Sequence, residues 1–292
     1  MNNMKKILAY ISPENYSSLF DIIVAYDAGV DVVVPYCNIK VADMRDMIHS
    51  CVFTRHPDKL NNTAIFIGGH DIRLGEEMMK KAIETLNELP EFFRVSITVD
   101  SDGAYTTSCA CVAKIKNSLG DLDGLNVTIL AGTGPVGQRV AVLLSWENCN
   151  VTLTSRKMSR SEAVCGIIEK GYGVKITPME VNSPETTEKA ISESDIVVTT
   201  GPEGVQILPK EIWSKFQKIK IMADLNAVPP YGIEGVEANF DGKEIAGKKV
   251  FGALAIGGLK MKSHHKLVGE LFTKKNRVFD LKQIYNLTLG LL

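Results

Sequence analysis

The chain has 292 residues, 45% of them hydrophobic, with 33 lysines and arginines against 34 aspartates and glutamates. Because these charges nearly balance, the chain has no excess of positive charge that would favour binding to nucleic acid or to an anionic membrane. The length predicts two domains. We see no targeting segment at the N-terminus and no apolar run near the roughly 20 residues that span a bilayer, so we expect a soluble, cytoplasmic protein.

The cysteines show no spacing typical of a disulfide framework or a metal site. None forms a C-x-x-C pair, and no histidine stands at ligand spacing beside one. We therefore expect no metal, and reduced, buried thiols in a cytosolic enzyme. The six residues are Cys37, Cys51, Cys109, Cys111, Cys149 and Cys165.

The first 120 residues alternate between strand and helix patterns. The β-branched segment 30–35 is typical of a buried parallel strand. Strands are expected at 6–11, 30–35, 63–68 and 94–99, and helices at 15–27, 41–50, 74–88 and 104–119. This alternation predicts a parallel sheet with helices on both faces. The glycine and aspartate run at 120–124 ends the pattern, so we place a domain boundary there, with a first domain of 1–120.

A second α/β run follows over residues 121–267 and predicts a Rossmann domain. Strands are expected at 126–130, 151–154, 175–178, 195–200 and 220–225, and helices at 135–146, 159–170 and 185–192. The final stretch, 262–292, has a helical pattern. In many two-domain dehydrogenases the last helix crosses back to the first domain, so we expect residues 268–292 to pack there.

A glycine-rich loop lies between the first strand of this second run and its helix, which is the context that a dinucleotide-binding fingerprint requires. Gly132 permits a tight turn, Gly134 lets the backbone approach a pyrophosphate, and Gly137 lets the helix pack closely on the strand. The helix amides and dipole then hold the phosphates. We therefore expect cofactor contacts from Gly132, Thr133, Gly134, Pro135, Val136 and Gly137.

The turn after the next strand indicates which dinucleotide binds. NAD enzymes place an acid about 20 residues beyond the loop for the ribose 2′-hydroxyl, whereas this turn reads Ser155-Arg156-Lys157 and carries no acid. Ser155 can donate to a 2′-phosphate and Arg156 can clamp or stack, while Lys157 and Arg160 add positive charge. NADP is therefore favoured. A solvated basic turn is the alternative, and some enzymes with such turns accept both cofactors.

Two further strand ends belong to the same carboxyl edge of the predicted sheet, where the cofactor passes. The strand at 195–200 ends in small residues, and we assign Thr200 and Gly201 to the nicotinamide side. Asn226 follows the strand at 220–225 and is also expected to contact the cofactor. Ordinary strand ends with helix caps are the alternative for both segments.

Three side chains are candidates for the chemistry. Lys260 follows a glycine-rich stretch that lets the chain pass close to a cofactor. Asp21 stands near an apolar helix, and Asp102 follows a strand, where an acid in a cleft can stabilise a substrate cation. A helix-surface lysine and ordinary capping acids are the alternatives.

These segments resemble the NADP-dependent methylene-tetrahydromethanopterin dehydrogenases of methylotrophic one-carbon metabolism, over essentially the whole chain. The stretches around Asn226 and Lys260 are much more specific than the glycine loop. The resemblance is carried by Phe20-Asp21 with Tyr26-Asp27, by 63–69 and 130–137, by Ala223-Asp224 with Asn226-Ala227 and Pro229-Pro230, and by 251–254 with 256–260.

The resemblance implies oxidation of methylene-tetrahydromethanopterin to the methenyl form with NADP as hydride acceptor; some relatives also take the tetrahydrofolate substrate. It implies an N-terminal domain for the pterin substrate, a C-terminal Rossmann domain, a cleft between them and a homo-oligomer, with a trimer favoured. Hydride leaves a carbon flanked by two nitrogens, so no proton transfer is needed, and the protein must align the reactants and tolerate a developing cation. Asp21 or Asp102 supplies the negative field, and Lys260 hydrogen-bonds the pterin or holds an acid in place.

The sequence departs from the family at a few positions. Ala28 and Ala255 replace glycines, His70 stands where a small residue is expected, and Thr154-Ser155 replaces a Cys-Gly pair. The alternatives are a methylene-tetrahydrofolate or shikimate-type dehydrogenase on the same scaffold, and a non-catalytic NADP sensor.

Overall fold

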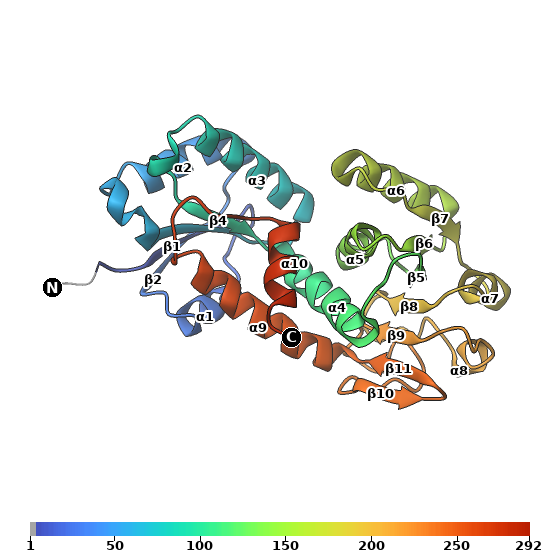
Figure 1. Cartoon of the computed structure of the whole chain (residues 1–292). Coiled ribbons are helices and arrows are strands. Elements are labelled where there is room, and N and C mark those ends of the chain that lie inside the picture. The colour runs from blue at the N-terminus through green and yellow to red at the C-terminus, as the bar shows by residue number, and fades with distance from the viewer. Residues whose placement is uncertain (1–3) are drawn as a thin grey trace. The chain divides into compact units, whose positions relative to one another are not determined.

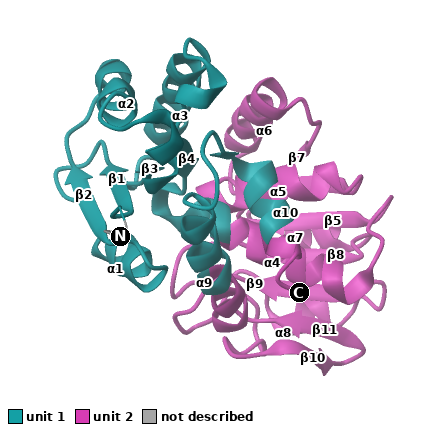
Figure 2. Cartoon of the chain, turned by 60° about the vertical axis from the view of Figure 1, so that its left-hand side comes forward, with its two compact units in different colours: residues 1–106, 261–287 teal, residues 107–260, 288–292 magenta. Residues whose placement is uncertain are grey.

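The structure is a computed structural model that describes residues 4–292. Residues 1–3, where the N-terminal stretch considered for a targeting segment begins, lie outside the described residues. Contacts divide the chain into two compact units, coloured separately in Figure 2. Unit 1 comprises residues 1–106 and 261–287, and unit 2 comprises residues 107–260 and 288–292.

The units divide at 106/107 and 260/261, whereas the sequence placed boundaries at 120/121 and 267/268. Helix α4 (Ala104–Leu119) explains the first difference, because it forms ion pairs inside unit 2. Lys114 lies 2.7 Å from Asp241, and Lys116 pairs with Glu147. The run at 120–124 therefore ends a helix of unit 2. Helix α9 (Ala253–Glu270) is shared between the units.

Unit 1 is built on a five-stranded parallel sheet in the order β12-β4-β3-β1-β2. Helices α2 and α3 lie over one face, and α1 and α9 over the other (Figure 1). The strands are β1 (Ile7–Ile11), β2 (Val32–Tyr36), β3 (Thr63–Ile67), β4 (Ser96–Val99) and β12 (Val278–Phe279). The helices are α1 (Leu19–Asp27), α2 (Met44–Val52), α3 (Ile72–Asn87) and α10 (Leu281–Leu289), with short 3-10 turns at Val41–Asp43, Pro57–Asn62, Glu91–Phe93 and Ser101–Gly103.

Two expectations for unit 1 are corrected. The segment 30–35 is not a buried strand, because β2 is the edge of the sheet, with Pro35 and Tyr36 exposed. Proline suits that position since it has no amide to offer a further strand. The stretch 262–292 is not one helical run either, because β12 separates α9 from α10 and pairs with β4, Val278 opposite Ile97. Thr98 holds this strand by donating from Oγ1 to the Phe279 carbonyl over 3.1 Å.

Unit 2 is built on a seven-stranded sheet in the order β10-β11-β9-β8-β5-β6-β7. The sequence missed its hairpin of β10 and β11, whose turn at Ala246-Gly247 has φ of +49° and +75°. The strands are β5 (Asn126–Leu130), β6 (Asn150–Ser155), β7 (Thr177–Glu180), β8 (Ile196–Thr199), β9 (Ile221–Asp224), β10 (Asp241–Ile245) and β11 (Lys248–Phe251). All pairs are parallel except β10 with β11.

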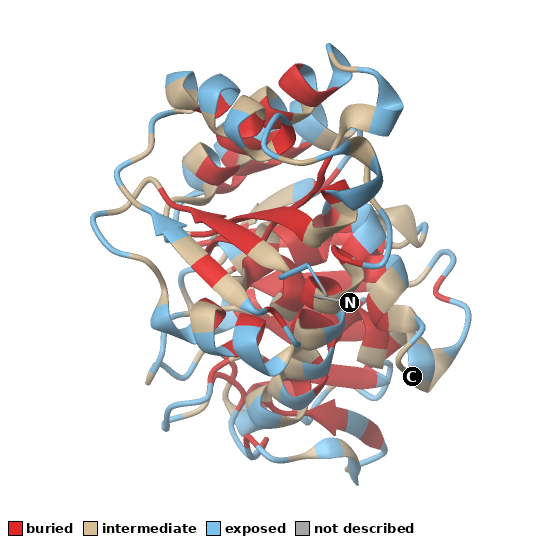
Figure 3. Cartoon of the chain, turned by 90° about the vertical axis from the view of Figure 1, so that its left-hand side faces the viewer, coloured by how far each residue is buried: buried red, intermediate tan, exposed pale blue. Residues whose placement is uncertain are grey.

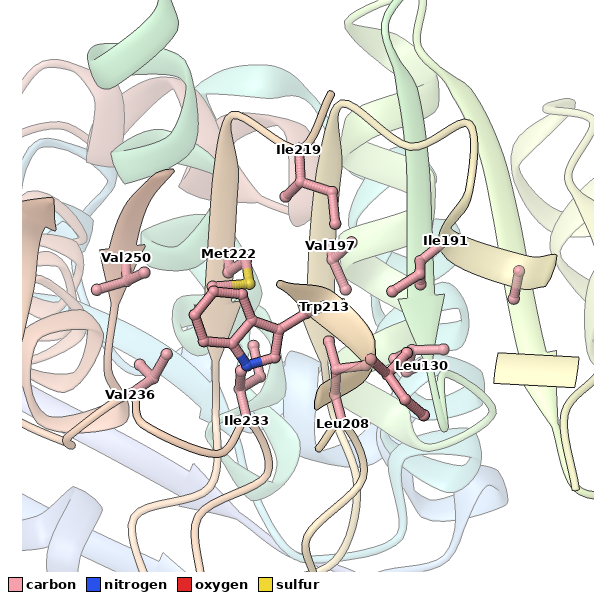
Figure 4. Close-up of a cluster of buried hydrophobic side chains, with 12 residues drawn as sticks. Leu130, Ile191, Val197, Leu208, Trp213, Ile219, Met222, Ile233, Val236 and Val250 are labelled. Atoms are coloured by element: carbon pink, nitrogen blue, oxygen red, sulfur yellow. The ribbon is translucent and has the colours of Figure 1, made fainter. Parts of the chain in front are cut away.

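Helices cover both faces of this second sheet (Figure 1). Besides α4, they are α5 (Pro135–Trp146), α6 (Met158–Tyr172), α7 (Pro184–Ile191) and α8 (Lys210–Trp213). Helices α7 and α8 close one apolar core around the buried Trp213, which packs with Met222 and Val250 from the sheet (Figure 4). Figure 3 shows the strands largely buried beneath more exposed helices. Together the two units confirm the predicted two-domain α/β fold.

In the described part of the chain, no helix is long and apolar enough to cross a membrane. No group of three or more metal-ligating side chains occurs among the described residues either. All six cysteines are free thiols. Three of them are buried, whereas Cys37, Cys51 and Cys149 are half-buried, so the expectation of uniformly buried thiols is corrected.

Candidate cofactor site and acid cluster

The strand order of unit 2 reverses between β5 and β8, since β6 and β7 lie on one side and β8 and β9 on the other. In open parallel sheets, ligands bind at the carboxyl ends of the strands at such a switch point. The glycine loop leaves β5 there. The amide of Ala131 donates to Thr154 Oγ1 over 3.1 Å, and the amide of Gly132 donates to the Thr154 carbonyl over 3.0 Å. The loop is thus fastened to β6.

The three fingerprint glycines have different surroundings. A Cβ on Gly132 would lie 2.8 Å from Ile129 Cγ2, and one on Gly137 would lie 2.4 Å from the Gly132 carbonyl and 2.6 Å from Thr200 Oγ1. A Cβ on Gly134 would meet nothing within 4 Å. Two glycines therefore allow close packing of loop, helix and strand, and the third leaves open space where a pyrophosphate can approach the backbone.

The N-terminus of α5 provides the amides for an anion. Gly134 is its N-cap and Pro135 occupies the first turn, where its missing N–H costs nothing. The first-turn amides of Val136 and Gly137 have no partner within the helix. They carry the positive end of the helix dipole, so this end of α5 is suited to a phosphate.

A cavity of about 800 Å³ opens beside this loop in unit 2. Of the residues predicted to bind cofactor, six line it: Thr133, Gly134, Ser155, Arg156, Thr200 and Gly201. Residues that the sequence did not assign to the cofactor also line it, among them Asn182, Ser183, Pro184, Val205 and Ile207. No sequence motif marks these residues, because they come from separate loops that only the sheet brings together.

The other six predicted cofactor residues are not part of the cavity lining. Gly132 and Gly137 are buried in the packing just described, and Pro135 and Val136 belong to the first turn of α5. Lys157 is the N-cap of α6. Asn226 is 3% exposed, with its Nδ2 donating to the Pro230 carbonyl over 3.1 Å. This asparagine therefore holds the loop after β9 in shape.

The basic part of the cavity lining combines Ser155, Arg156 and Arg160. Ser155 is buried at the end of β6, and both arginines are exposed and line the cavity. The turn itself has no acid, but β7 pairs with β6 and brings Glu180 opposite Ser155. Sequence spacing missed this acid because it approaches from the neighbouring strand.

Asp224 organises the strand ends beside the cavity. It is 1% exposed, and it accepts hydrogen bonds from Thr199 Oγ1 at 2.7 Å and from the amides of Asn226 and Ile233 at 3.0 and 2.9 Å. Burial raises the pKa of this carboxyl, and these hydrogen bonds act in the opposite direction. Asp224 therefore fixes the positions of the segments that follow β8 and β9.

In unit 1, Asp21 belongs to a buried cluster near the ends of β1 and β3. Tyr10 donates from its hydroxyl to Asp21 Oδ2 over 3.1 Å, and His264 Nε2 lies 3.8 Å from Asp21 Oδ1. The imidazole of His264 stacks on Phe66, which also stacks on Tyr10, with ring centroids 5.5 and 5.7 Å apart. Burial and the charge of Asp21 raise the pKa of Tyr10 far above its ordinary range. The tyrosine therefore remains a hydroxyl donor.

The second candidate acid, Asp102, also belongs to unit 1, and its amide donates to the Gly69 carbonyl over 2.7 Å. It has a φ of +55° in the turn after β4, and it lies 3.1 Å from Nδ1 of His70. Both side chains are more than half exposed, at 54% and 68%. The histidine that departs from the family pattern thus pairs with this acid.

Lys260 lies in α9, one helical turn before His264. Gly252 precedes this helix, and a Cβ there would lie 2.1 Å from the Glu237 carbonyl. Close approach of backbone to backbone at Gly252 is therefore required where α9 begins. Gly257 and Gly258 have open surroundings instead.

Comparison with known proteins places the chain in a family. Residues 19–102 match the family described as methylene-tetrahydromethanopterin dehydrogenase, N-terminal. The chain is 38% identical over 284 residues to the bifunctional protein MdtA of Methylorubrum extorquens, covering 97% of this chain and 98% of that protein. The chain belongs to the methylene-tetrahydromethanopterin dehydrogenase family.

A second relative within this family, also from M. extorquens, is named NAD(P)-dependent methylenetetrahydromethanopterin dehydrogenase. It is 29% identical over 294 residues, which cover 98% of each protein. The resemblance inferred from the sequence motifs is thus confirmed.

Two solved structures share the fold. The 5-ketofructose reductase of Gluconobacter sp. strain CHM43 is 15% identical with a TM-score of 0.50, covering 99% of both chains. The shikimate 5-dehydrogenase of Listeria monocytogenes is 12% identical with a TM-score of 0.50, covering 97% of this chain and 96% of that one. At such identities the likeness supports the two-domain α/β architecture alone.

Proposed function

We propose that this member of the methylene-tetrahydromethanopterin dehydrogenase family oxidises methylene-tetrahydromethanopterin to the methenyl form with NADP. The observation that carries the proposal is the cavity at the β5/β8 switch point, which is lined by residues of the glycine loop and by two arginines. The relative named for this substrate and for NAD(P) aligns over the full chain, which supports the same substrate and cofactor class here.

The residues around the cavity fit a phosphorylated dinucleotide. The amides of Val136 and Gly137 would hold the pyrophosphate, and open space at Gly134 admits it. Ser155, Arg156 and Arg160 would bind the 2′-phosphate with charge-assisted hydrogen bonds, while Thr200 and Gly201 would flank the nicotinamide. When bound, NADP supplies the acceptor for the hydride that leaves the substrate.

We assign the reaction's charge stabilisation to Asp21. A carboxylate favours the cation that develops on the carbon between two nitrogens. Tyr10 and His264 are positioning residues, since Tyr10 donates to Asp21, His264 lies 3.8 Å from it, and both rings stack on Phe66. Lys260 is assigned to hydrogen-bonding the pterin or holding an acid in place, and Asp102 is the second candidate for the negative field.

Unit 1 is proposed to bind the substrate and unit 2 the cofactor. In unit 1, a cavity of about 320 Å³ lies near the ends of β1 and β2, which supports this division. Its lining is mainly apolar and includes Ile39, Lys40, Leu74 and Met78. A cytoplasmic location stays a prediction.

We further propose a homo-oligomer, with a trimer favoured. Helix α1 presents an apolar face at helical spacing, with Leu19 69%, Ile23 51% and Tyr26 49% exposed. Contiguous exposed apolar residues are typical of protein interfaces. Sedimentation velocity of Ile23→Lys is expected to show a smaller species. The matched control is Ile167→Lys, because Ile167 is 63% exposed on another helix.

The proposed function is tested by following methenyl product formation from methylene-tetrahydromethanopterin with NADP and NAD in parallel. Methylene-tetrahydrofolate and shikimate serve as competing substrates. We expect the highest kcat/KM with methylene-tetrahydromethanopterin and NADP, and a large loss of kcat in Asp21→Asn. Turnover of shikimate alone, or cofactor binding without turnover of either pterin, would overturn the assignment.

A further inference from the structure

Glu180 lies beside the part of the cavity that would receive the 2′ substituent of the cofactor ribose. The parallel pairing of β6 and β7 sets Glu180 opposite Ser155. The next amide, that of Val181, donates to the Ser155 carbonyl over 2.8 Å and fixes this register. The position is therefore determined by the sheet of unit 2.

Both carboxylate oxygens of Glu180 accept hydrogen bonds. Oε2 accepts from the amide of Met158, the first residue of α6, over 2.8 Å. Oε1 accepts from Asn182 Nδ2, also over 2.8 Å, and Asn182 lines the cavity. The negative charge is thus held at the N-terminus of α6, where the helix dipole stabilises it. Because the carboxylate accepts the hydrogen bond of the Met158 amide, that amide is not available to bind a phosphate.

The charge of Glu180 acts differently on the two dinucleotides. A phosphate monoester carries about two negative charges at pH 7, so a nearby carboxylate repels the 2′-phosphate of NADP. The 2′-hydroxyl of NAD carries no charge and can donate to a carboxylate. Arg156 and Arg160, which line the same cavity, attract the phosphate, and Glu180 offsets part of that attraction.

We propose that Glu180 is a specificity-determining residue that lowers the preference for NADP over NAD. The inference rests on the proposed function only for the identity of the cofactors. The acid contributed by β7 keeps NAD usable in a site whose turn after β6 carries only positive charge.

The test compares the affinities of the wild-type chain and Glu180→Gln for NADP and NAD, measured by calorimetry without pterin. Glutamine has the same shape, accepts from Met158, and can donate to Asn182 after rotation of that amide. We expect the Kd for NADP to fall about threefold to tenfold and the Kd for NAD to stay within twofold or rise. The ratio of kcat/KM values should shift in the same direction.

Two controls separate charge at this position from other effects. Glu193→Gln makes the same change of charge at a side chain that is 82% exposed and pairs with Lys218 at 3.1 Å, and we expect no shift in the ratio. Glu180→Asp keeps the charge and should keep the wild-type ratio. Thermal unfolding of each variant reports whether α6 is still capped.

Different outcomes overturn the inference and the function. If the ratio of the Kd values for NADP and NAD stayed within twofold of wild type in Glu180→Gln, or shifted equally in Glu193→Gln, the role of Glu180 would be overturned. The dehydrogenase activity would not be affected by that result. Wild-type protein that binds neither dinucleotide would overturn both. A shifted ratio without turnover of any pterin would leave Glu180 supported and overturn the proposed reaction.

Discussion

The hydroxyl of Tyr10 donates a hydrogen bond to Oδ2 of Asp21 over 3.1 Å, with both side chains buried. Gly68 makes room for that hydroxyl, since a Cβ there would lie 2.1 Å from it. The same hydroxyl accepts from the amide of Ser18, the N-cap of α1. Tyr10 therefore fixes both the acid and the start of the helix that carries it.

We expect Tyr10→Phe to impair turnover more than cofactor binding. Phenylalanine keeps the stacking on Phe66 but removes the donor to Asp21. A hydrogen bond to a charged group contributes about 1.5–3 kcal/mol, so the free energy of unfolding should fall by that amount and kcat about tenfold. Denaturant titration and steady-state kinetics measure the two effects, while the Kd for NADP should not change.

The matched control for this variant is Tyr26→Phe. The Tyr26 hydroxyl accepts from the Val33 amide over 3.4 Å, and the side chain is half exposed. This control should leave kcat within twofold of wild type. The same small effect in Tyr10→Phe would contradict the positioning role of Tyr10.

The raised pKa of Tyr10 predicts a loss of stability at alkaline pH. Burial is the largest cause, followed by the charge of Asp21. The unfolded chain releases this proton near pH 10, whereas the folded chain keeps it to a higher pH. The contribution is therefore complete below about pH 10 and declines as pH rises, by up to about 1.4 kcal/mol per pH unit.

Unfolding free energies between pH 8 and about pH 11 measure this decline. Tyr10→Phe has no proton to release at this position and should show a shallower decline than wild type. Tyr26→Phe should follow the wild-type slope. Parallel curves for wild type and Tyr10→Phe would show that the raised pKa does not limit stability in that range.

Asp224→Asn is expected to destabilise unit 2 although it preserves shape. Both carboxylate oxygens accept from donors, Oδ1 from Thr199 and Asn226 and Oδ2 from Ile233. An asparagine would turn an NH₂ group toward at least one of them, leaving buried donors unsatisfied at a cost of about 1–3 kcal/mol. The melting temperature should fall, and the Kd for NADP should rise.

Glu193→Gln is the control for that substitution, because it also removes one negative charge from unit 2. The Glu193 side chain is 82% exposed and pairs with Lys218, whose side chain is 41% exposed. Exposed pairs of this kind contribute about 0–1 kcal/mol. An equal loss of stability in both variants would contradict the role given to the buried carboxyl.

The sequence predicts locally encoded elements best. Helix α5 occupies Pro135–Trp146, the expected range, because an apolar period, an N-terminal proline and a preceding glycine all agree. The hairpin at 241–251 and strand β12 were missed. Short strands depend on distant partners, as Val278 depends on Ile97, and carry little pattern of their own.

In the candidate site, too, the sequence predicts the residues that form contiguous motifs and misses those that only the fold brings together. The glycine loop and the Ser155-Arg156 turn are visible as contiguous motifs, and the structure brings both to one cavity. No motif reveals Glu180, because it stands 25 positions after its partner Ser155 and only the pairing of β6 with β7 brings the two together. Tyr10 and His264 likewise join Asp21 from β1 and α9.

The fingerprint glycines allow a prediction that separates packing from ligand binding. In Gly137→Ala, the new Cβ would lie 2.4 Å from the Gly132 carbonyl and 2.6 Å from Thr200 Oγ1. The helix must move away from the loop, so both stability and NADP affinity should fall, the affinity at least tenfold. In Gly134→Ala, the Cβ meets nothing within 4 Å, so only NADP affinity should fall, because the methyl group projects where the pyrophosphate would lie.

Gly166→Ala supplies the matched control for these two variants. Gly166 lies in the interior of α6 with nothing within 4 Å of an added Cβ, and alanine there should stabilise the chain by about 0.5–1 kcal/mol without affecting NADP. Thermal unfolding and calorimetric titration with NADP measure both properties. If Gly134→Ala bound NADP as tightly as wild type, the backbone at this loop would not be the pyrophosphate site, and the cofactor would have to enter the cavity in another orientation.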